Sequence, residues 1–242
     1  MTRVFFLKGH EHMEYTKKIV CLANSRRMSG RCIAGKEYIS GKFGAWVRPV
    51  SSRSTAEISE EERRYENGDG PSVLDIVSIP VSAPRPQGFQ TENHLIDPNF
   101  YWKKLDVLPW NHLEDALDLD KPELWVNGHK SFTGINDRVP QGIANEITSS
   151  LMLIRPENLE VVVSEVLNSK RKVHADFSYR GQHYKLTVTD PTIEKFYLAK
   201  TNGTYGIPDA YMCVSMAGEP FEGFYYKLVA SIITTDLFKR ST

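Results

Sequence analysis

The chain has 242 residues, of which 40% are hydrophobic and 11% are aromatic. This content is enough to bury the cores of two compact units, so it excludes a disordered, collagen-like or coiled-coil chain. Thirty Lys and Arg residues balance thirty Asp and Glu residues, which excludes a uniformly basic nucleic-acid-binding protein. Any electrostatic argument must therefore rest on how the charges are distributed.

The charges are strongly segregated in the first half of the sequence. Residues 17–53 carry nine basic side chains and one acidic side chain, Glu37, for a net charge of +8. Residues 54–123 carry fifteen acidic and six basic side chains, for a net charge of −9. The sequence leaves two interpretations open: the two segments neutralise each other, or the basic segment faces a ligand.

The sequence favours an intracellular protein. Residues 1–16 are expected to form an N-terminal tail, and their only apolar stretch, at 4–6, is too short for a secretory signal. No apolar stretch approaches the ~20 residues that span a bilayer, so we expect no membrane partner. The three cysteines, Cys21, Cys32 and Cys213, lack CxxC spacing, which favours reduced thiols. The expected location is the cytoplasm.

The first half is predicted to form a small barrel with an elaborated middle. Apolar and β-branched runs predict strands at 18–23, 44–50 and 73–81, with closing strands near 124–132 and 151–155. A polar loop is expected at 24–36. Ser59 and Pro109 each introduce a predicted short helix, because serine caps a helix start and proline favours its first position. Residues 83–145 are expected to be an irregular insert.

The second half shows a tighter pattern. Strands are predicted at 159–167, 173–179, 184–189, 211–216 and 224–234. Asp190 and Pro191 start the single helix between the third and fourth of these strands. This order matches a five-stranded Greek-key barrel of the oligonucleotide-binding (OB) type. The expected fold class is mainly β with short helices, built from two tandem OB-like five-stranded Greek-key barrels at residues 17–156 and 157–242.

Two stretches of the sequence resemble the dual OB-fold domain family. They are KIVCLANSRRMSGRCIAGKE with GAWVRPVS in the first half, and YMCVSMAGEPF with YYKLVASII in the second. The resemblance spans residues 17–236. It implies tandem OB barrels in a prokaryotic, cytoplasmic protein with a nucleic-acid-binding role, often in defence systems. It brings no established set of catalytic residues.

The expected loop at 24–36 is the leading candidate for a ligand site. In OB folds the loop between the first two strands borders the ligand groove. Here that loop carries four cations, Arg26, Arg27, Arg31 and Lys36. Guanidinium groups can bind phosphate oxygens in a forked geometry. Cys32 lies in the same loop, where we expect it to be a small packed residue.

Two strands offer further candidates for nucleic-acid contact. Trp46 and Arg48 alternate along one strand and therefore point to the same face. An aromatic ring beside a cation suits single-stranded nucleic acid, although burial of Trp46 in the core is the more common fate of a lone tryptophan. Tyr226 and Lys227 are the corresponding candidates in the second half.

These features predict a non-enzymatic protein that binds single-stranded DNA or RNA, with no cofactor and no metal. One alternative is a sensor that holds a nucleotide or small anion in a pocket between the two barrels. Another is a protein-interaction module whose charged segments bind a partner encoded by a neighbouring gene. Enzymatic signals are poor: GKEYISGK at 35–42 lacks the spacing and the Ser or Thr of a phosphate-binding loop, which leaves a hydrolase based on Cys32 as the remaining enzymatic alternative.

Overall fold

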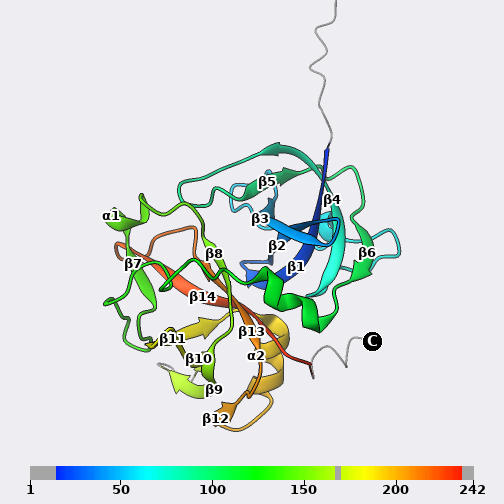
Figure 1. Cartoon of the computed structure of the whole chain (residues 1–242). Helices are drawn as coiled ribbons and strands as arrows, with labels where there is room; N and C mark the ends of the chain where they lie inside the picture. The colour runs from blue at the N-terminus through cyan, green and yellow to red at the C-terminus, as the bar shows by residue number, and fades with distance from the viewer. Residues whose placement is uncertain (1–14, 167–169, 236–242) are drawn as a thin grey trace, which may run out of the picture.

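A computed structural model describes residues 15–166 and 170–235 of the chain. The two halves form two β-rich units that pack side by side (Figure 1). The expected fold class, mainly β with short helices and two OB-like barrels, is confirmed. No helix in these ranges is long and apolar enough to cross a membrane.

The first barrel is closed by five strands. Its strands are β1 (Tyr15–Arg27), β2 (Gly30–Ile39), β3 (Lys42–Val50), β4 (Asp75–Pro84) and β5 (Asn93–Ile96), with β6 (Lys103–Val107) added outside. They run in the order β1-β2-β3-β5-β4, and β4 pairs back onto β1 to close the barrel. The contact between β3 and β5 is parallel, whereas the others are antiparallel. β6 pairs with the outer edge of β4.

Three details expected for the first half are wrong. The loop at 24–36 is a β-hairpin, in which a two-residue turn joins β1 to β2 and Arg26 lies opposite Arg31. One face of this hairpin is exposed and polar, so its sequence has the composition of a loop. The fifth strand, β5, lies inside 83–145, which was expected to be irregular. The sequence does not reveal this strand, because four residues are too few to show a clear alternation. Residues 124–132 contain no strand.

The second barrel repeats the strand order of the first. Its strands are β9 (Glu157–Val166), β10 (Lys170–Tyr179), β11 (Gln182–Val188), β13 (Tyr211–Met216) and β14 (Phe224–Ile233). They run in the order β9-β10-β11-β14-β13, again with a parallel pair, β11 and β14. Helix α2 (Pro191–Leu198) follows β11, and the Asp190 side chain accepts hydrogen bonds from the backbone N–H groups of Thr192 and Ile193, as the sequence predicted.

The edges of the second sheet differ from those of the first. β12 (Gly203–Gly206) pairs with β9, and β8 (Leu151–Ile154) pairs with β13. β8 was expected to close the first barrel, but it joins the second sheet instead. The remaining elements are short: η1 (Glu61–Arg63) and η2 (Trp110–Ala116) are 3-10 helices at the two predicted helix sites, while β7 (Arg138–Pro140) pairs with β14 and leads into α1 (Gln141–Ala144).

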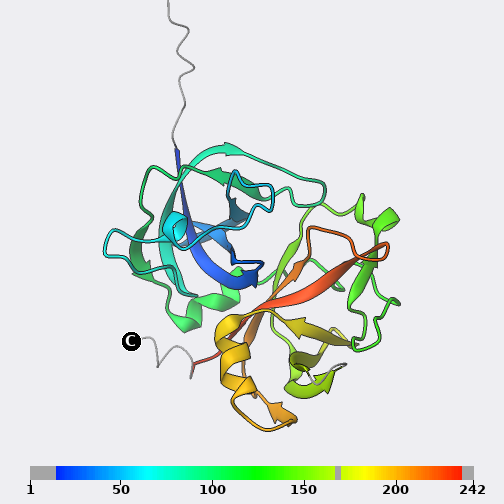
Figure 2. The ribbon, with the colours of Figure 1, turned by 180° about the vertical axis from the view of Figure 1, so that it is seen from behind.

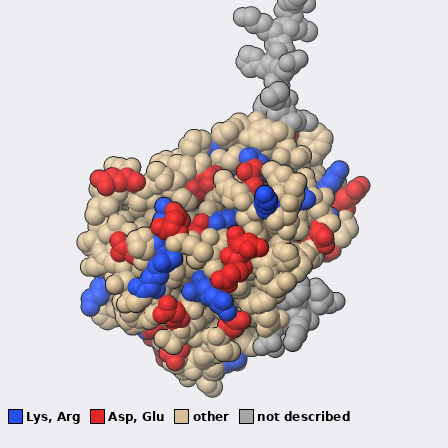
Figure 3. Space-filling model, in the orientation of Figure 1, with Lys and Arg blue, Asp and Glu red and all other residues tan. Residues whose placement is uncertain are grey.

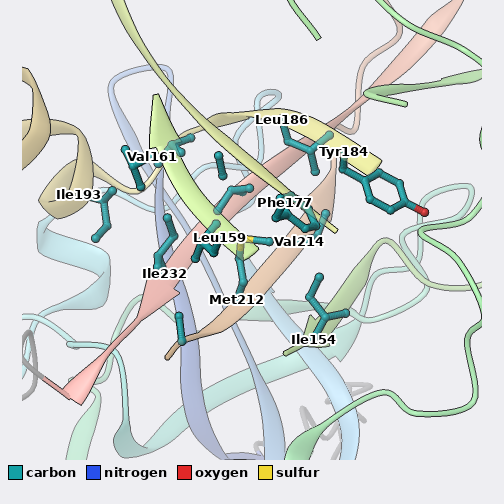
Figure 4. Packing of buried hydrophobic residues seen from close by; sticks show 14 of the residues in the cluster. Ile154, Leu159, Val161, Phe177, Tyr184, Leu186, Ile193, Met212, Val214 and Ile232 are labelled. Atoms are coloured by element: carbon teal, nitrogen blue, oxygen red, sulfur yellow. The ribbon is translucent and has the colours of Figure 1, made fainter. Parts of the chain in front are cut away.

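Each barrel has its own apolar core, and a third cluster joins the two. Figure 4 shows the interior of the second barrel, where Val161, Phe177 and Met212 meet from three different strands. The third cluster brings Leu22 of β1 against residues of β8 and β13. The outer wall formed by β1, β2 and β3 is therefore covered by η2 and by strands of the second sheet. Leu22 also accepts a hydrogen bond from the Ser231 hydroxyl through its carbonyl.

Candidate nucleic-acid interface

The covered wall contains three of the predicted site residues, and two of them, Lys36 and Trp46, lie opposite each other on β2 and β3. The Lys36 ammonium lies 2.6 Å from the Asp118 carboxylate and donates to the Ala116 carbonyl at 2.8 Å. The Trp46 indole N–H donates to the same carboxylate at 3.1 Å. Asp118 also accepts from the backbone N–H of Leu153 on β8. It therefore ties both side chains to the second half of the chain.

Arg48 lies further along the same wall and is only 2% exposed. Its guanidinium is 3.3 Å from the Glu92 carboxylate and donates to the Ser150 hydroxyl at 2.7 Å, while that hydroxyl donates to Glu92. Trp46 and Arg48 do share a face, as the strand alternation predicted. That face is the covered wall, so the expectation that Lys36 and Arg48 are accessible to a ligand is wrong.

Lys227 is also buried, with 1% of its surface exposed. Its ammonium donates to the Val126 carbonyl at 2.6 Å and lies 5.4 Å from the centre of the Tyr184 ring. Burial lowers the pKa of Lys227 to about 7, because the charged form loses its hydration. The expectation of an accessible Lys227 is wrong, since alternation along β14 turns it away from the face that carries Tyr226.

Tyr226 belongs to a half-exposed group of aromatic rings and one arginine. We call this group the aromatic patch, and its members are His129, Arg138, Phe221, Phe224 and Tyr226. The centres of the Tyr226 and Phe221 rings are 6.4 Å apart, and Phe221 is 62% exposed. Arg138 lies opposite Tyr226 on β7, and its guanidinium is 4.3 Å from the centre of the Phe224 ring. A cation among accessible rings can stack on nucleobases.

The β1–β2 hairpin separates the three arginines of the predicted loop. Arg26 and Arg31 face each other across the hairpin, and alternation puts Arg27 on the other face. Arg26 makes a two-pronged ion pair with Glu194 of α2, with N–O distances of 3.2 and 2.9 Å. Its backbone N–H donates to the Thr189 carbonyl. The hairpin therefore docks beside the start of α2, as Figure 2 shows.

A shallow groove of about 760 Å³ lies between Arg31 and α2. We call it the hairpin groove, and its lining residues are Arg31, Pro191, Thr192, Lys195, Phe196, Ala199 and Lys200. Four of them follow a spacing of three and four residues along the helix, so they share one face of α2. The lining provides three cations and one phenylalanine ring, and it contains no carboxylate.

The groove is positively charged and partly rigid. Arg31 is fixed by two backbone hydrogen bonds to Ile58, and its side chain has no ion pair within the described chain. The Lys200 ammonium lies 4.5 Å from the centre of the Phe196 ring. Burial and then the nearby charge of Arg31 lower the pKa of Arg63, a neighbour outside the groove lining. The face in Figure 3, by contrast, mixes acidic and basic side chains.

The groove residues on α2 were missed by the sequence analysis. The helix itself was predicted, but only Asp190 was considered, as its cap. The periodicity of PTIEKFYLAK contains the missing signal, because Ile193 and Tyr197 mark the buried face. Lys195 is exposed, and Phe196 lies at the edge of the buried face, where it packs partly against the core. Their position beside Arg31 comes from the tertiary fold and could not be predicted.

The described residues offer little for enzymatic chemistry. They include no group of three or more His, Cys, Asp or Glu side chains that could hold a metal ion. Burial raises the pKa of the Cys21 and Cys213 thiols, which disfavours the reactive thiolate. Cys32 is half-buried in β2. No hydrogen bond joins its thiol to a histidine in the part of the chain that the structure describes.

Comparison with known proteins gives one informative match. Neither the curated proteins nor the solved structures contain a match to this chain. The model of one protein family, described as the dual OB-containing domain, matches residues 17–232. That range includes both barrels and the groove between the hairpin and α2. The chain therefore belongs to the dual OB-containing domain family.

Proposed function

We propose that the protein binds single-stranded nucleic acid along the hairpin groove and does so without catalysis. The observation that supports this most strongly is the lining of the groove: three cations and a ring, with no carboxylate among them. Phosphates repeat along a nucleic-acid strand and bases have flat apolar faces, so such a lining matches both parts of the ligand. The OB fold is one that oligonucleotide-binding proteins commonly use.

Each part of the groove has a defined role in this proposal. Arg31, Lys195 and Lys200 neutralise successive phosphates, and Phe196 stacks on a base. The aromatic patch around Tyr226 provides a second stacking surface on the second barrel. With three phosphate contacts, the affinity should fall with salt concentration at a slope of about −2 on logarithmic axes. The neutral overall charge is consistent with modest affinity.

Fluorescence anisotropy with a labelled single-stranded 15-mer, as DNA and as RNA, tests the proposal. The triple variant Arg31→Ala, Lys195→Ala, Lys200→Ala should bind at least about tenfold more weakly than the wild type at low salt. The matched control changes Lys42, Lys121 and Lys130 to Ala, which removes the same charge outside the groove. Its affinity for the 15-mer should fall by less than about threefold. Equal losses in the two triple variants would mean that binding is non-specific attraction.

The two other functions considered from the sequence lead to different results. A sensor for a nucleotide or small anion would use an enclosed pocket between the barrels. The hairpin groove is instead open to solvent, which favours an extended strand over a small anion. Thermal stabilisation by phosphate without oligonucleotide binding would favour the sensor. Capture of a neighbouring gene product through the acidic 54–123 segment would favour the interaction module.

A further inference from the structure

A second concave site lies on another side of the first barrel, over residues of β1, β4 and β6. It has a volume of about 450 Å³ and shares no lining residue with the hairpin groove. We call it the Tyr101 pocket. Its aromatic walls are Tyr15, Phe100 and Tyr101, and its polar lining includes Glu66 and Lys103. Phe100 and Tyr101 are 48% and 46% exposed, although large aromatic side chains are usually well buried.

These exposed rings are held in place by the buried residues beside them. Trp102, which follows Tyr101, is 1% exposed and packs inside the barrel. Its backbone N–H donates to the Arg64 carbonyl at 3.3 Å. The Tyr65 hydroxyl donates to the buried Asp75 carboxylate at 2.9 Å, which anchors the chain next to Glu66. The exposure of the rings is therefore a property of an ordered site.

The polar groups of the pocket are available to a ligand. Among the residues that the structure describes, the side chains of Glu66 and Lys103 have no hydrogen-bond or ion-pair partner, although the Lys103 backbone pairs with Ser78 in the sheet. The pocket therefore offers one acceptor and one charged donor beside its aromatic walls. Two further cations lie over the rings. The Arg64 guanidinium is 5.4 Å from the Tyr101 ring centre, and the Lys17 ammonium, which pairs with Glu37, is 5.9 Å from that of Tyr15.

We propose that the Tyr101 pocket binds one nucleotide. The base stacks against Tyr101 and Phe100, its polar edge donates to Glu66, and the phosphate pairs with Lys103. The volume lies in the range of small-ligand sites, about 300–1,000 Å³. A proline-rich peptide is the other common ligand of aromatic surfaces, but it binds in an extended groove. Its recognition does not require an acidic and a basic side chain such as Glu66 and Lys103. This site goes beyond the proposed function, because none of its residues lies in the hairpin groove.

Isothermal titration with AMP, CMP, GMP and UMP tests the site directly. At least one nucleotide should bind with a Kd below about 1 mM. Tyr101→Ala and Lys103→Ala should each weaken that binding by at least about tenfold. Phe132→Ala removes an aromatic side chain that is 95% exposed elsewhere, so it serves as the matched control and should change nothing. Circular dichroism of each variant verifies that the chain remains folded.

Two further arms identify the source of the nucleotide and separate this proposal from the previous one. If Tyr101→Ala also weakens binding of the labelled 15-mer, the natural ligand is a base of a bound strand. If the variant weakens only mononucleotide binding, the natural ligand is a free nucleotide. The groove triple variant should weaken the 15-mer and leave the mononucleotide unchanged. Three results would overturn the assignment: none of the four nucleotides binds, Tyr101→Ala leaves nucleotide binding unchanged, or a polyproline peptide displaces the nucleotide.

Discussion

The outer wall of the first barrel and the hairpin groove carry the same kinds of cations in opposite settings. On the wall, Lys36 and Arg48 are buried and pair with Asp118 and Glu92 of the acidic segment. In the groove, Arg31 comes from the same basic segment, but no described carboxylate pairs with it. Mutual neutralisation of the two charged segments is therefore observed for Lys36 and Arg48, and ligand contact by Arg31 stays a proposal. The comparison shows that a cation's tertiary partner, rather than its place in a basic run, decides whether it can meet a ligand.

The largest expected effect comes from the wall. Arg48→Met leaves the Glu92 carboxylate buried without its partner, and breaking a buried pair in this way typically costs about 3–5 kcal/mol of unfolding free energy. Replacing both residues with apolar ones should cost much less. Urea denaturation measures both variants. A loss below about 1 kcal/mol for Arg48→Met would contradict a structural role for this pair.

Lys227 gives a pH-dependent test of burial. Its pKa is about 7 in the folded protein and near 10.5 when unfolded, so between these values the unfolded chain binds more protons. The unfolding free energy should therefore rise with pH across this window, by up to about 1.4 kcal/mol per pH unit from this group. Lys227→Met should remove that part of the slope between pH 7 and 9. Identical slopes in both proteins would show that Lys227 is solvated.

The cap of α2 links stability to the groove. Asp190→Ala removes the acceptor for two backbone N–H groups, which should lower the unfolding free energy by about 1 kcal/mol. Asp190→Asn keeps an acceptor and should cost less. Thermal denaturation compares the two variants. Because α2 carries Lys195 and Phe196, the alanine variant should also weaken oligonucleotide binding more than the asparagine variant does.

The smallest expected effect on stability concerns the ion pair between Arg26 and Glu194. This pair is partly exposed, so Glu194→Gln should change the unfolding free energy by less than about 1 kcal/mol. The same change releases Arg26 beside the hairpin groove and should strengthen oligonucleotide binding. The salt slope should steepen by about 0.7. Weaker binding after this change would place the strand away from α2.

The sequence predicts the repeated strand order better than it predicts the site. Apolar alternation locates the long strands, and Asp190 with Pro191 locates α2. The pattern fails at β5, whose NHLI sequence is too short, and at the first hairpin, whose exposed face looks like a loop. The partners of the cations could not be predicted, because Asp118 lies 82 residues from Lys36. Only the folded chain brings Lys195 of the second half to Arg31 of the first.

The salt dependence of oligonucleotide binding tests the central claim most directly. The association constant for a single-stranded 15-mer is measured at several NaCl concentrations for the wild type and for the groove triple variant. Loss of three phosphate contacts should make the logarithmic slope shallower by about two, while the control triple variant keeps the wild-type slope. Parallel lines for the wild type and the groove variant would contradict the account, because they would show that Arg31, Lys195 and Lys200 do not contact the strand.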